Sequence, residues 1–188
     1  MSTKVCTGLC RFSYLNVFQP RKANNSDDLE YSVTLLIPKS DTATLQKMKA
    51  AMAEARENFC RRNGANALPA KPNHTLHDGD GEKDSGDPFG EECHGNWVIS
   101  VKSKQPVKLI DQYKNTITDP AALYSGCYGQ AVINFYGYSK NGKKGISAGL
   151  LGLRKIKDGE PLSGSVCTDS DFDDDSVAGE IGADDDWM

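Results

Sequence analysis

The charges of this chain are divided between two parts, and the division limits which part can fold. Residues 158–188 carry eleven Asp and Glu and no Lys or Arg, whereas residues 1–157 carry 22 Lys and Arg against 15 Asp and Glu. The body therefore has a formal charge of +7 and the C-terminal segment one of −11. A segment rich in Asp, Ser and Gly buries too little apolar surface to offset its chain entropy. We expect a folded domain over residues 1–157 and a disordered acidic tail over residues 158–188.

A body of 157 residues is long enough to bury a core without disulfides or metals. The first ten residues, MSTKVCTGLC, lack a long apolar run. No stretch of the chain approaches the roughly 20 apolar residues that a membrane helix needs. We therefore expect a cytoplasmic protein whose six scattered cysteines are reduced.

The hydrophobic pattern predicts strands on both sides of a single helix. Apolar residues recur three and four positions apart from Leu45 to Phe59, between a possible N-cap at Ser40 and a stop at Gly64. This pattern predicts a helix over residues 41–63. Runs rich in β-branched and aromatic residues predict strands over residues 3–18, 29–38, 96–104, 106–111, 126–138 and 145–157.

This order of elements predicts a mainly β protein, an OB-fold-like small β-barrel with one inserted α-helix. The dipeptide Asn141-Gly142 predicts a hairpin between the last two strands. Four glycines inside these strands, at positions 129, 137, 149 and 152, favour the sharp coiling of a small barrel. A β-sandwich with one helix is the alternative.

Residues 65–95 are predicted to form a long loop, which holds the candidates for a metal or catalytic site. The run DGDGE at residues 78–82 alternates carboxylates, but Lys83 and Phe89 stand where a helix–loop–helix calcium loop needs Gly and Glu. The histidines and cysteine of this segment lack a strong zinc spacing. We expect no cofactor, no bound metal and no enzymatic activity. The alternative is a metal-dependent nuclease that uses His77, Asp78, Asp80 and Glu82.

Strand 126–138 carries tyrosines alternating with amides on one face and small apolar residues on the other. Tyrosines next to amides suit a platform on which nucleic-acid bases stack, although an ordinary half-exposed strand looks the same. Lysines gather near Pro106 and around the hairpin turn, as in a phosphate track or a solvated face. The predicted DNA-binding residues are Arg11, Tyr14, Lys102, Lys104, Lys108, Tyr128, Tyr136, Tyr138, Lys143 and Lys144.

Four stretches of the sequence resemble a known family. They are RFSYLNVFQP, LLIPKSD, HDGDGE and the long run from YSGCYGQ to KDGEPL. The chain is similar over about residues 4–162 to tailed-bacteriophage single-stranded-DNA-binding proteins with an OB-fold. This resemblance implies a sequence-independent single-stranded-DNA-binding protein of phage DNA replication or recombination, working in the cytoplasm of the infected bacterial host.

The tail contains an acid–aromatic motif, DDDW at residues 184–187. Proteins of this functional class often carry such a motif, and the resemblance implies docking of phage replication proteins through Asp184, Asp185, Asp186 and Trp187. We also expect the tail to compete with DNA for the basic body at a high effective concentration. The remaining alternative is a protein-interaction module whose acidic tail mimics DNA.

Overall fold

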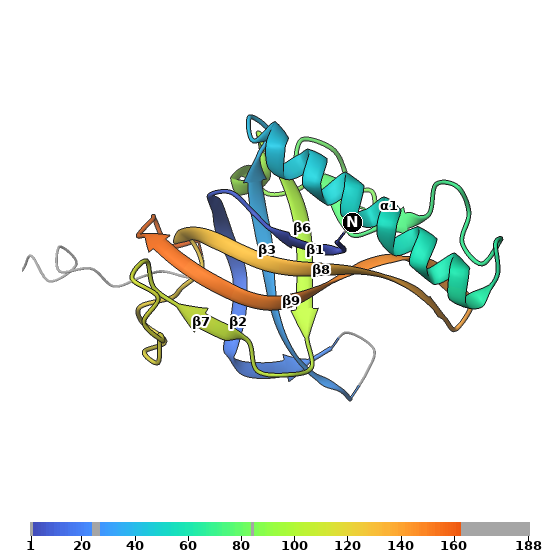
Figure 1. Cartoon of the computed structure of the whole chain (residues 1–188). Coiled ribbons are helices and arrows are strands. Elements are labelled where there is room, and N and C mark those ends of the chain that lie inside the picture. Colours follow the sequence, from blue (N-terminus) through green and yellow to red (C-terminus); the bar gives the residue numbers. More distant parts are fainter. Residues whose placement is uncertain (1, 24–26, 84, 163–188) are drawn as a thin grey trace, which may run out of the picture.

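The computed structural model describes residues 2–23, 27–83 and 85–162, and the figures show how the elements are arranged (Figure 1). Within these residues no helix combines the length and apolar character needed to cross a membrane. The elements of the described part are β1 (Lys4–Cys6), β2 (Cys10–Lys22), β3 (Leu29–Pro38), α1 (Thr42–Asn63), β4 (Asn73–His74), β5 (Leu76–Asp78), the 3-10 helix η1 (Glu91–Cys93), β6 (Asn96–Ser103), β7 (Lys108–Ile110), β8 (Tyr128–Lys140) and β9 (Lys143–Lys157).

The long strands close into a ring in the order β8, β2, β3, β6 and β9, with β9 paired back to β8. Neighbours in this ring are antiparallel except β6 and β9, which run parallel where Lys102 lies opposite Gly149. This order is OB-fold-like, and the prediction of a mainly β, OB-fold-like chain with one inserted α-helix is confirmed. Because one sheet closes on itself, the alternative of two stacked sheets is wrong.

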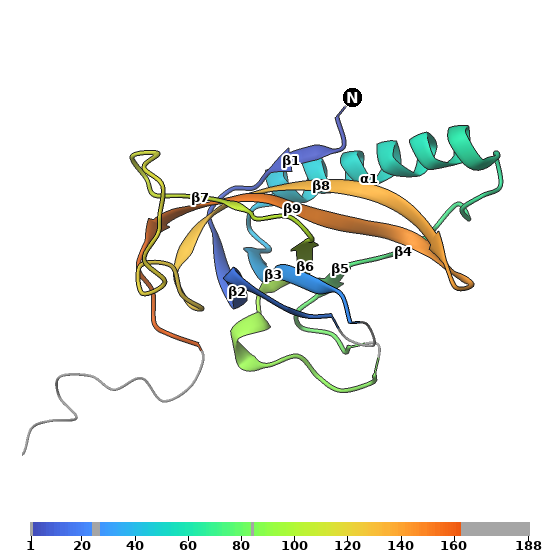
Figure 2. The ribbon, with the colours of Figure 1, turned by 90° about the horizontal axis from the view of Figure 1, so that it is seen from below.

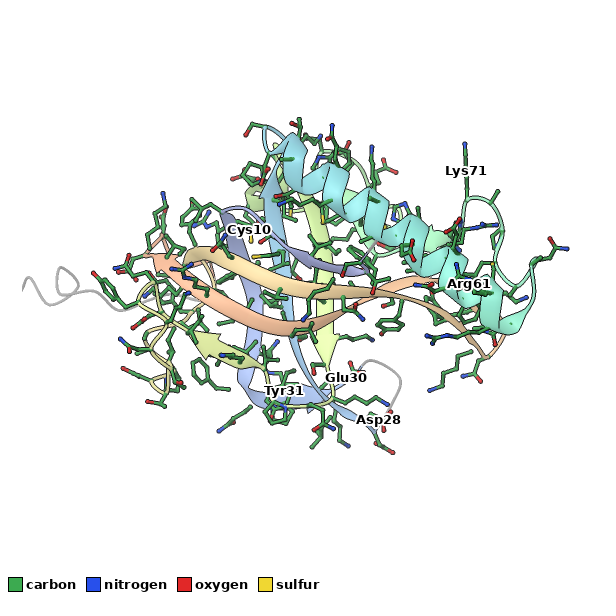
Figure 3. All side chains as sticks on the ribbon, in the orientation of Figure 1. Cys10, Asp28, Glu30, Tyr31, Arg61 and Lys71 are labelled. Atoms are coloured by element: carbon green, nitrogen blue, oxygen red, sulfur yellow. The ribbon has the colours of Figure 1, made fainter. Side chains whose placement is uncertain are left out.

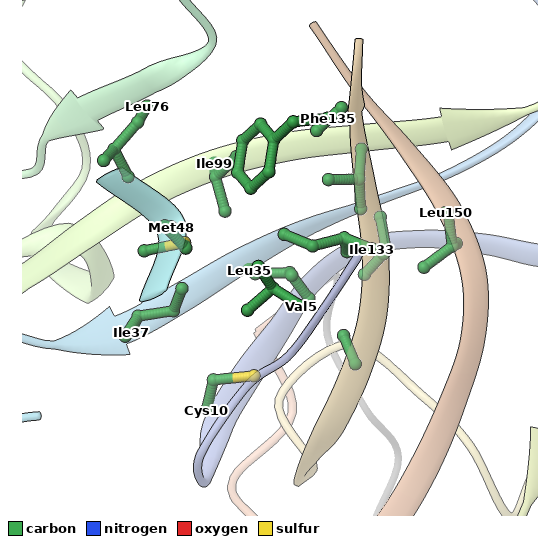
Figure 4. Close-up of a cluster of buried hydrophobic side chains, with 14 of the residues drawn as sticks. Val5, Cys10, Leu35, Ile37, Met48, Leu76, Ile99, Ile133, Phe135 and Leu150 are labelled. Atoms are coloured by element: carbon green, nitrogen blue, oxygen red, sulfur yellow. The ribbon is translucent and has the colours of Figure 1, made fainter. Parts of the chain in front are cut away.

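The core fills the inside of the ring and continues under α1 (Figure 4). Alternate residues of each strand point inward, among them Leu35 on β3, Ile99 on β6, Ile133 and Phe135 on β8 and Leu150 on β9. The predicted apolar face of the strand that became β8 is therefore buried. Part of β3 is buried on both sides, because Leu36 points outward into a second cluster with Cys93 and Val98.

Helix α1 lies where the pattern predicts it, across one end of the ring and along the β8–β9 hairpin (Figures 1 and 2). Its buried residues include Met48, Ala51 and Ala55. The N-cap is Asp41 and not Ser40, since the Asp41 carboxylate accepts a hydrogen bond from the Thr44 amide at 3.1 Å. The same carboxylate accepts the Thr44 hydroxyl at 2.6 Å, which fixes the first turn.

The prediction of one continuous first strand is wrong, because the chain turns between β1 and β2 at Thr7–Leu9. The Gly8 amide donates to the Thr44 hydroxyl oxygen at 2.9 Å, which ties this turn to the start of α1. A Cβ on Gly8 would overlap the Asp41 carboxylate, so a side chain at this position would have to displace the N-cap. The long loop prediction also needs correction, since residues 65–95 include β4, β5 and η1.

The β8–β9 hairpin continues beyond the ring and ends at the predicted turn (Figure 2). Asn141 and Gly142 both have positive φ, 53° and 78°, as a two-residue hairpin of this kind requires. Gly137 lies directly under Phe59 of α1, where an added Cβ would be 2.6 Å from the Phe59 Cβ. The helix therefore supports the hairpin along its outer part.

Candidate nucleic-acid interface

An open groove of about 1070 Å³ lies on the outer face of β3 and β6. One wall is the β2–β3 turn, which contributes Ala23 and Asp28, and the other is the outer part of the β8–β9 hairpin. The segment around β4 and β5 closes the third side, because β4 pairs with β9 and β5 pairs with β6. The long strand hairpins and this short crossing segment together position the groove.

Five of the residues predicted from sequence line this groove: Lys102, Lys104, Tyr136, Tyr138 and Lys143. Tyr136 is 42% exposed, and its Cε1 lies 3.7 Å from the position of a Cβ on Gly149. Lys140, which stands before the hairpin turn, also lines the groove.

The groove contains two acids that sequence reasoning missed, Asp28 and Glu30 (Figure 3). Glu30 lies 3.6 Å from the Lys102 ammonium, and Asp28 lies 3.5 Å from that of Lys104. The alternation along β3 could have placed Glu30 in the groove, because Glu30, Ser32 and Thr34 share the outward face of the strand. Two groove lysines therefore already have counterions, which an incoming phosphate would have to replace.

Five predicted residues lie outside the lining of the groove, and three of them, Lys108, Lys144 and Tyr14, lie apart from one another. Lys108 is on β7 and pairs with Gly152 further along β9. Lys144 is exposed beside the hairpin turn, opposite Ser139. Tyr14 is 69% exposed and has a φ of 47°, at an irregularity of β2 where the pairing with β3 shifts register.

Arg11 and Tyr128 form a separate cationic and aromatic cluster with Lys157. The Arg11 guanidinium carbon lies 5.5 Å and the Lys157 ammonium 4.8 Å from the centre of the Tyr128 ring. Arg11 also donates to the carbonyl oxygens of Gly126 at 3.1 Å and of Glu160 at 2.5 Å. Arg11 thus binds the first residues after β9.

The described residues 158–162 lie against the body. The Tyr124 hydroxyl donates to the Asp158 carboxylate at 3.0 Å, and the Lys155 ammonium lies 2.6 Å from it. Hydrogen bonds from Lys155, which has the larger effect, and from Tyr124 hold the pKa of the Asp158 carboxyl group below its usual value. The Leu162 amide donates to the Ser125 carbonyl at 3.0 Å. The division between domain and tail at residue 157 stays a prediction, but the first five residues after it contact the domain.

The acidic run at residues 78–82 is built around a lysine. The Lys39 ammonium lies 2.6 Å from a carboxylate oxygen of Asp78 and 2.6 Å from one of Asp80. These contacts lower the pKa of both carboxyl groups and raise the pKa of Lys39. Among the described residues, no group of three or more His, Cys, Asp or Glu side chains has the arrangement of a metal site. The geometry gives Asp78 and Asp80 a structural partner.

The described cysteines, namely Cys6, Cys10, Cys60, Cys93 and Cys127, are not in disulfides. Burial raises the pKa of the Cys10 thiol to about 12, so this thiol is neutral at physiological pH. The predicted partner-binding residues Asp184, Asp185, Asp186 and Trp187 lie outside the described residues.

The sequence of this chain matches a family described as the Enterobacter phage Enc34 ssDNA-binding protein over residues 3–182. The chain belongs to this family. A relative, the putative protein p50 of Acyrthosiphon pisum secondary endosymbiont phage 1, is 32% identical over 177 residues, which cover 90% of this chain and 92% of the relative.

Solved structures have the same fold. The single-stranded DNA-binding protein of bacteriophage Enc34 in complex with ssDNA has a TM-score of 0.74 and 26% identity, covering 86% of this chain and 90% of its own. A second structure of the same phage protein has a TM-score of 0.71 and 27% identity, covering 92% of this chain and 90% of its own. The bacteriophage T7 protein gp2.5 shares the fold alone, with a TM-score of 0.60 and 13% identity over 93% of this chain and 94% of its own.

Proposed function

We propose that this protein binds single-stranded DNA without sequence preference, in the groove on the outer face of β3 and β6, during phage DNA replication or recombination. The observation that carries the proposal is the position of the groove. It lies on the second and third strands of the OB-like ring, between the β2–β3 turn and the β8–β9 hairpin. OB-folds bind oligonucleotides on this face and with these loops. A similar phage protein solved in complex with ssDNA supports the binding of single-stranded DNA.

The groove lining suits a single strand with unstacked bases. Tyr136 and Tyr138 offer rings on which bases stack, and stacking accepts any base because each has a π face. Lys140 and Lys143 lie next to them on the hairpin and can contact phosphates. We assign these contacts to backbone and stacking, which carry no sequence information.

The acidic tail has two roles in this proposal. It competes with DNA for the basic body, and it recruits phage replication proteins through Asp184, Asp185, Asp186 and Trp187. Trp is enriched at the centres of protein interfaces, and neighbouring aspartates would steer it to a basic surface. Replacement of Trp187 by Ala should leave DNA affinity unchanged at fixed salt and abolish capture of the replication proteins. Capture that survives this change but not the exchange of the three aspartates for asparagine would contradict the aromatic anchor.

The test of DNA binding compares one groove lysine with one lysine elsewhere. Fluorescence anisotropy with a labelled dT oligomer and with a duplex is measured over a salt series for Lys143→Gln and for Lys49→Gln, an exposed position on α1. Loss of one phosphate contact should weaken single-strand binding and reduce the log–log salt slope by about 0.7. The Lys49 variant should match the unmodified protein.

Equal affinities and salt slopes for the two variants would contradict the assigned groove, and absence of oligomer binding by the unmodified protein would contradict the function.

The same mixtures, incubated with Mg²⁺ or Mn²⁺ and run on a denaturing gel, test the nuclease alternative. Shortening of the labelled oligomer would support that alternative and contradict a purely binding role.

A further inference from the structure

A second pocket, of about 460 Å³, lies between α1, the segment of residues 70–74 and the start of β9. Its apolar surface comes from Met52 and Ala53 of α1, from Pro72 and from Ile146 at the start of β9. Two basic residues, Arg56 and Lys71, stand at its edge. The volume falls in the range of pockets that hold small ligands.

The wall of this pocket is fixed by Arg56. Its Nε donates to the Pro69 carbonyl at 2.6 Å and its Nη2 to the Leu68 carbonyl at 3.2 Å. Leu68 is buried in the main core, which anchors the segment that leads to Lys71 and Pro72. Because these hydrogen bonds already hold the wall in place, a ligand would have to order little of the protein on binding. The entropic cost of binding is correspondingly smaller.

We propose that this pocket binds the acid–aromatic motif of the chain itself, residues 184–187, with the Trp187 indole inside and the aspartates at the basic edge. The charges are complementary: Arg56 and Lys71 against Glu57 leave the lining with a net charge of +1 when His74 is neutral, and the motif carries three aspartates. Trp combines a large apolar ring with one N–H donor, which suits an apolar pocket with a polar edge.

The chain between the domain and the motif is long enough. Twenty-four residues lie between Leu162, the last described residue, and Trp187. Fully extended, this length spans about 85 Å. A domain of this size has a radius of gyration of about 15 Å. The motif can therefore reach any face of its own domain, including the end of α1 that lies opposite the point where the described chain ends (Figure 1).

The docked motif would lie behind the DNA groove. Pro72, His74 and Ile146 line both the groove and this pocket, so the two cavities share a wall. The proposal goes beyond DNA binding and does not require it, because the occupant and the pocket belong to the same protein.

The experiment is ¹⁹F NMR of the full-length protein labelled with 5-fluorotryptophan. The chain has two tryptophans, and Trp187→Phe identifies the signal of Trp187. The reference is a labelled peptide of residues 176–188 free in solution. The pocket variant is Ala53→Glu, and the matched control is Ala50→Glu, since both alanines are exposed on α1 and only Ala53 lines the pocket.

We expect the Trp187 signal of the unmodified protein to be shifted and broadened relative to the free peptide. Ala53→Glu should return it to the free position, Lys71→Glu should do so in part, and Ala50→Glu should leave it shifted. A signal at the free position in the unmodified protein would overturn the proposal. The proposal would also be overturned if the signal stayed shifted in Ala53→Glu and returned to the free position when a dT oligomer was added. The motif would then occupy the DNA groove. Anisotropy with the same oligomer reports DNA binding separately.

Discussion

Tyr136 and Phe135 are neighbours in sequence, and the two-residue period of a strand gives them opposite environments. Phe135 is 1% exposed inside the ring, whereas Tyr136 is 42% exposed in the groove. Tyr136→Ala should weaken binding of a dT oligomer by about 1–3 kcal/mol if the ring stacks on a base. Phe135→Ala should lower the free energy of unfolding by about 3–5 kcal/mol. Titration and thermal melting of each variant separate the effects. A Tyr136 variant that loses stability but keeps the affinity of its folded fraction would contradict the stacking assignment.

Lys39 links Asp78 and Asp80, and this ion pair predicts a pH dependence. Its hydrogen bonds lower the pKa of both carboxyl groups in the folded protein. Their stabilising contribution is therefore present above the unfolded-state pKa of about 3.9 and is lost as the pH falls through the folded-state values. As the pH falls from 5 to 2, the stability of Lys39→Met should decrease less than that of the unmodified protein. Thermal melts across this range measure the decrease, with Lys47→Met, an exposed position on α1, as the control. Parallel pH profiles of all three proteins would show that the ion pair contributes nothing.

At the scale of elements, the contact between α1 and the β8–β9 hairpin depends on Gly137. An added Cβ would lie 2.6 Å from the Phe59 Cβ, closer than real side chains approach. Gly137→Ala should therefore push the hairpin from the helix and destabilise the protein by about 1–3 kcal/mol. Gly149→Ala is the matched control on β9, because its Cβ would meet no atom closer than 3.7 Å. Chemical denaturation should show a loss for Gly137→Ala and little change for Gly149→Ala. Equal stabilities would mean that the helix does not support the hairpin.

At the scale of the whole molecule, the +7 body and the −11 C-terminal segment predict opposite effects on DNA binding. Truncation after Leu162 removes most of the acids and keeps the described contacts of residues 158–162 with Arg11, Tyr124 and Ser125. This variant should bind a dT oligomer more tightly and discriminate less against duplex. Truncation after Lys157 should also lower the thermal stability, because Arg11 then loses its hydrogen bond to the Glu160 carbonyl oxygen. Anisotropy and melting of both truncations test these outcomes. Unchanged affinity after removal of the tail would contradict competition by the acidic segment.

The sequence alone determined the local structure of this protein. The 3.6-residue period from Leu45 to Phe59 places α1, and the Asn-Gly pair places the hairpin turn, because both signals depend on neighbours in the chain. The alternation along residues 126–138 also separates buried from exposed side chains correctly. The resemblance, carried by specific stretches of residues, added the family. Local patterns failed where a distant contact overrides them. The first strand was predicted as continuous, but the hydrogen bond from the Gly8 amide to Thr44 of α1 holds a turn between β1 and β2.

The tertiary structure decided which residues meet. Lys102, Tyr136 and Lys143 come from three strands and share one groove, while Arg11 and Tyr128 gather elsewhere. No periodicity encodes this division, because it depends on the closure of the ring and on the register between strands distant in sequence. The same holds for Glu30 beside Lys102 and for Lys39 between two aspartates, since ion pairs form only after folding brings the charges within a few ångströms. Patterns along a chain specify faces and turns, whereas a site needs the packing of whole elements against one another.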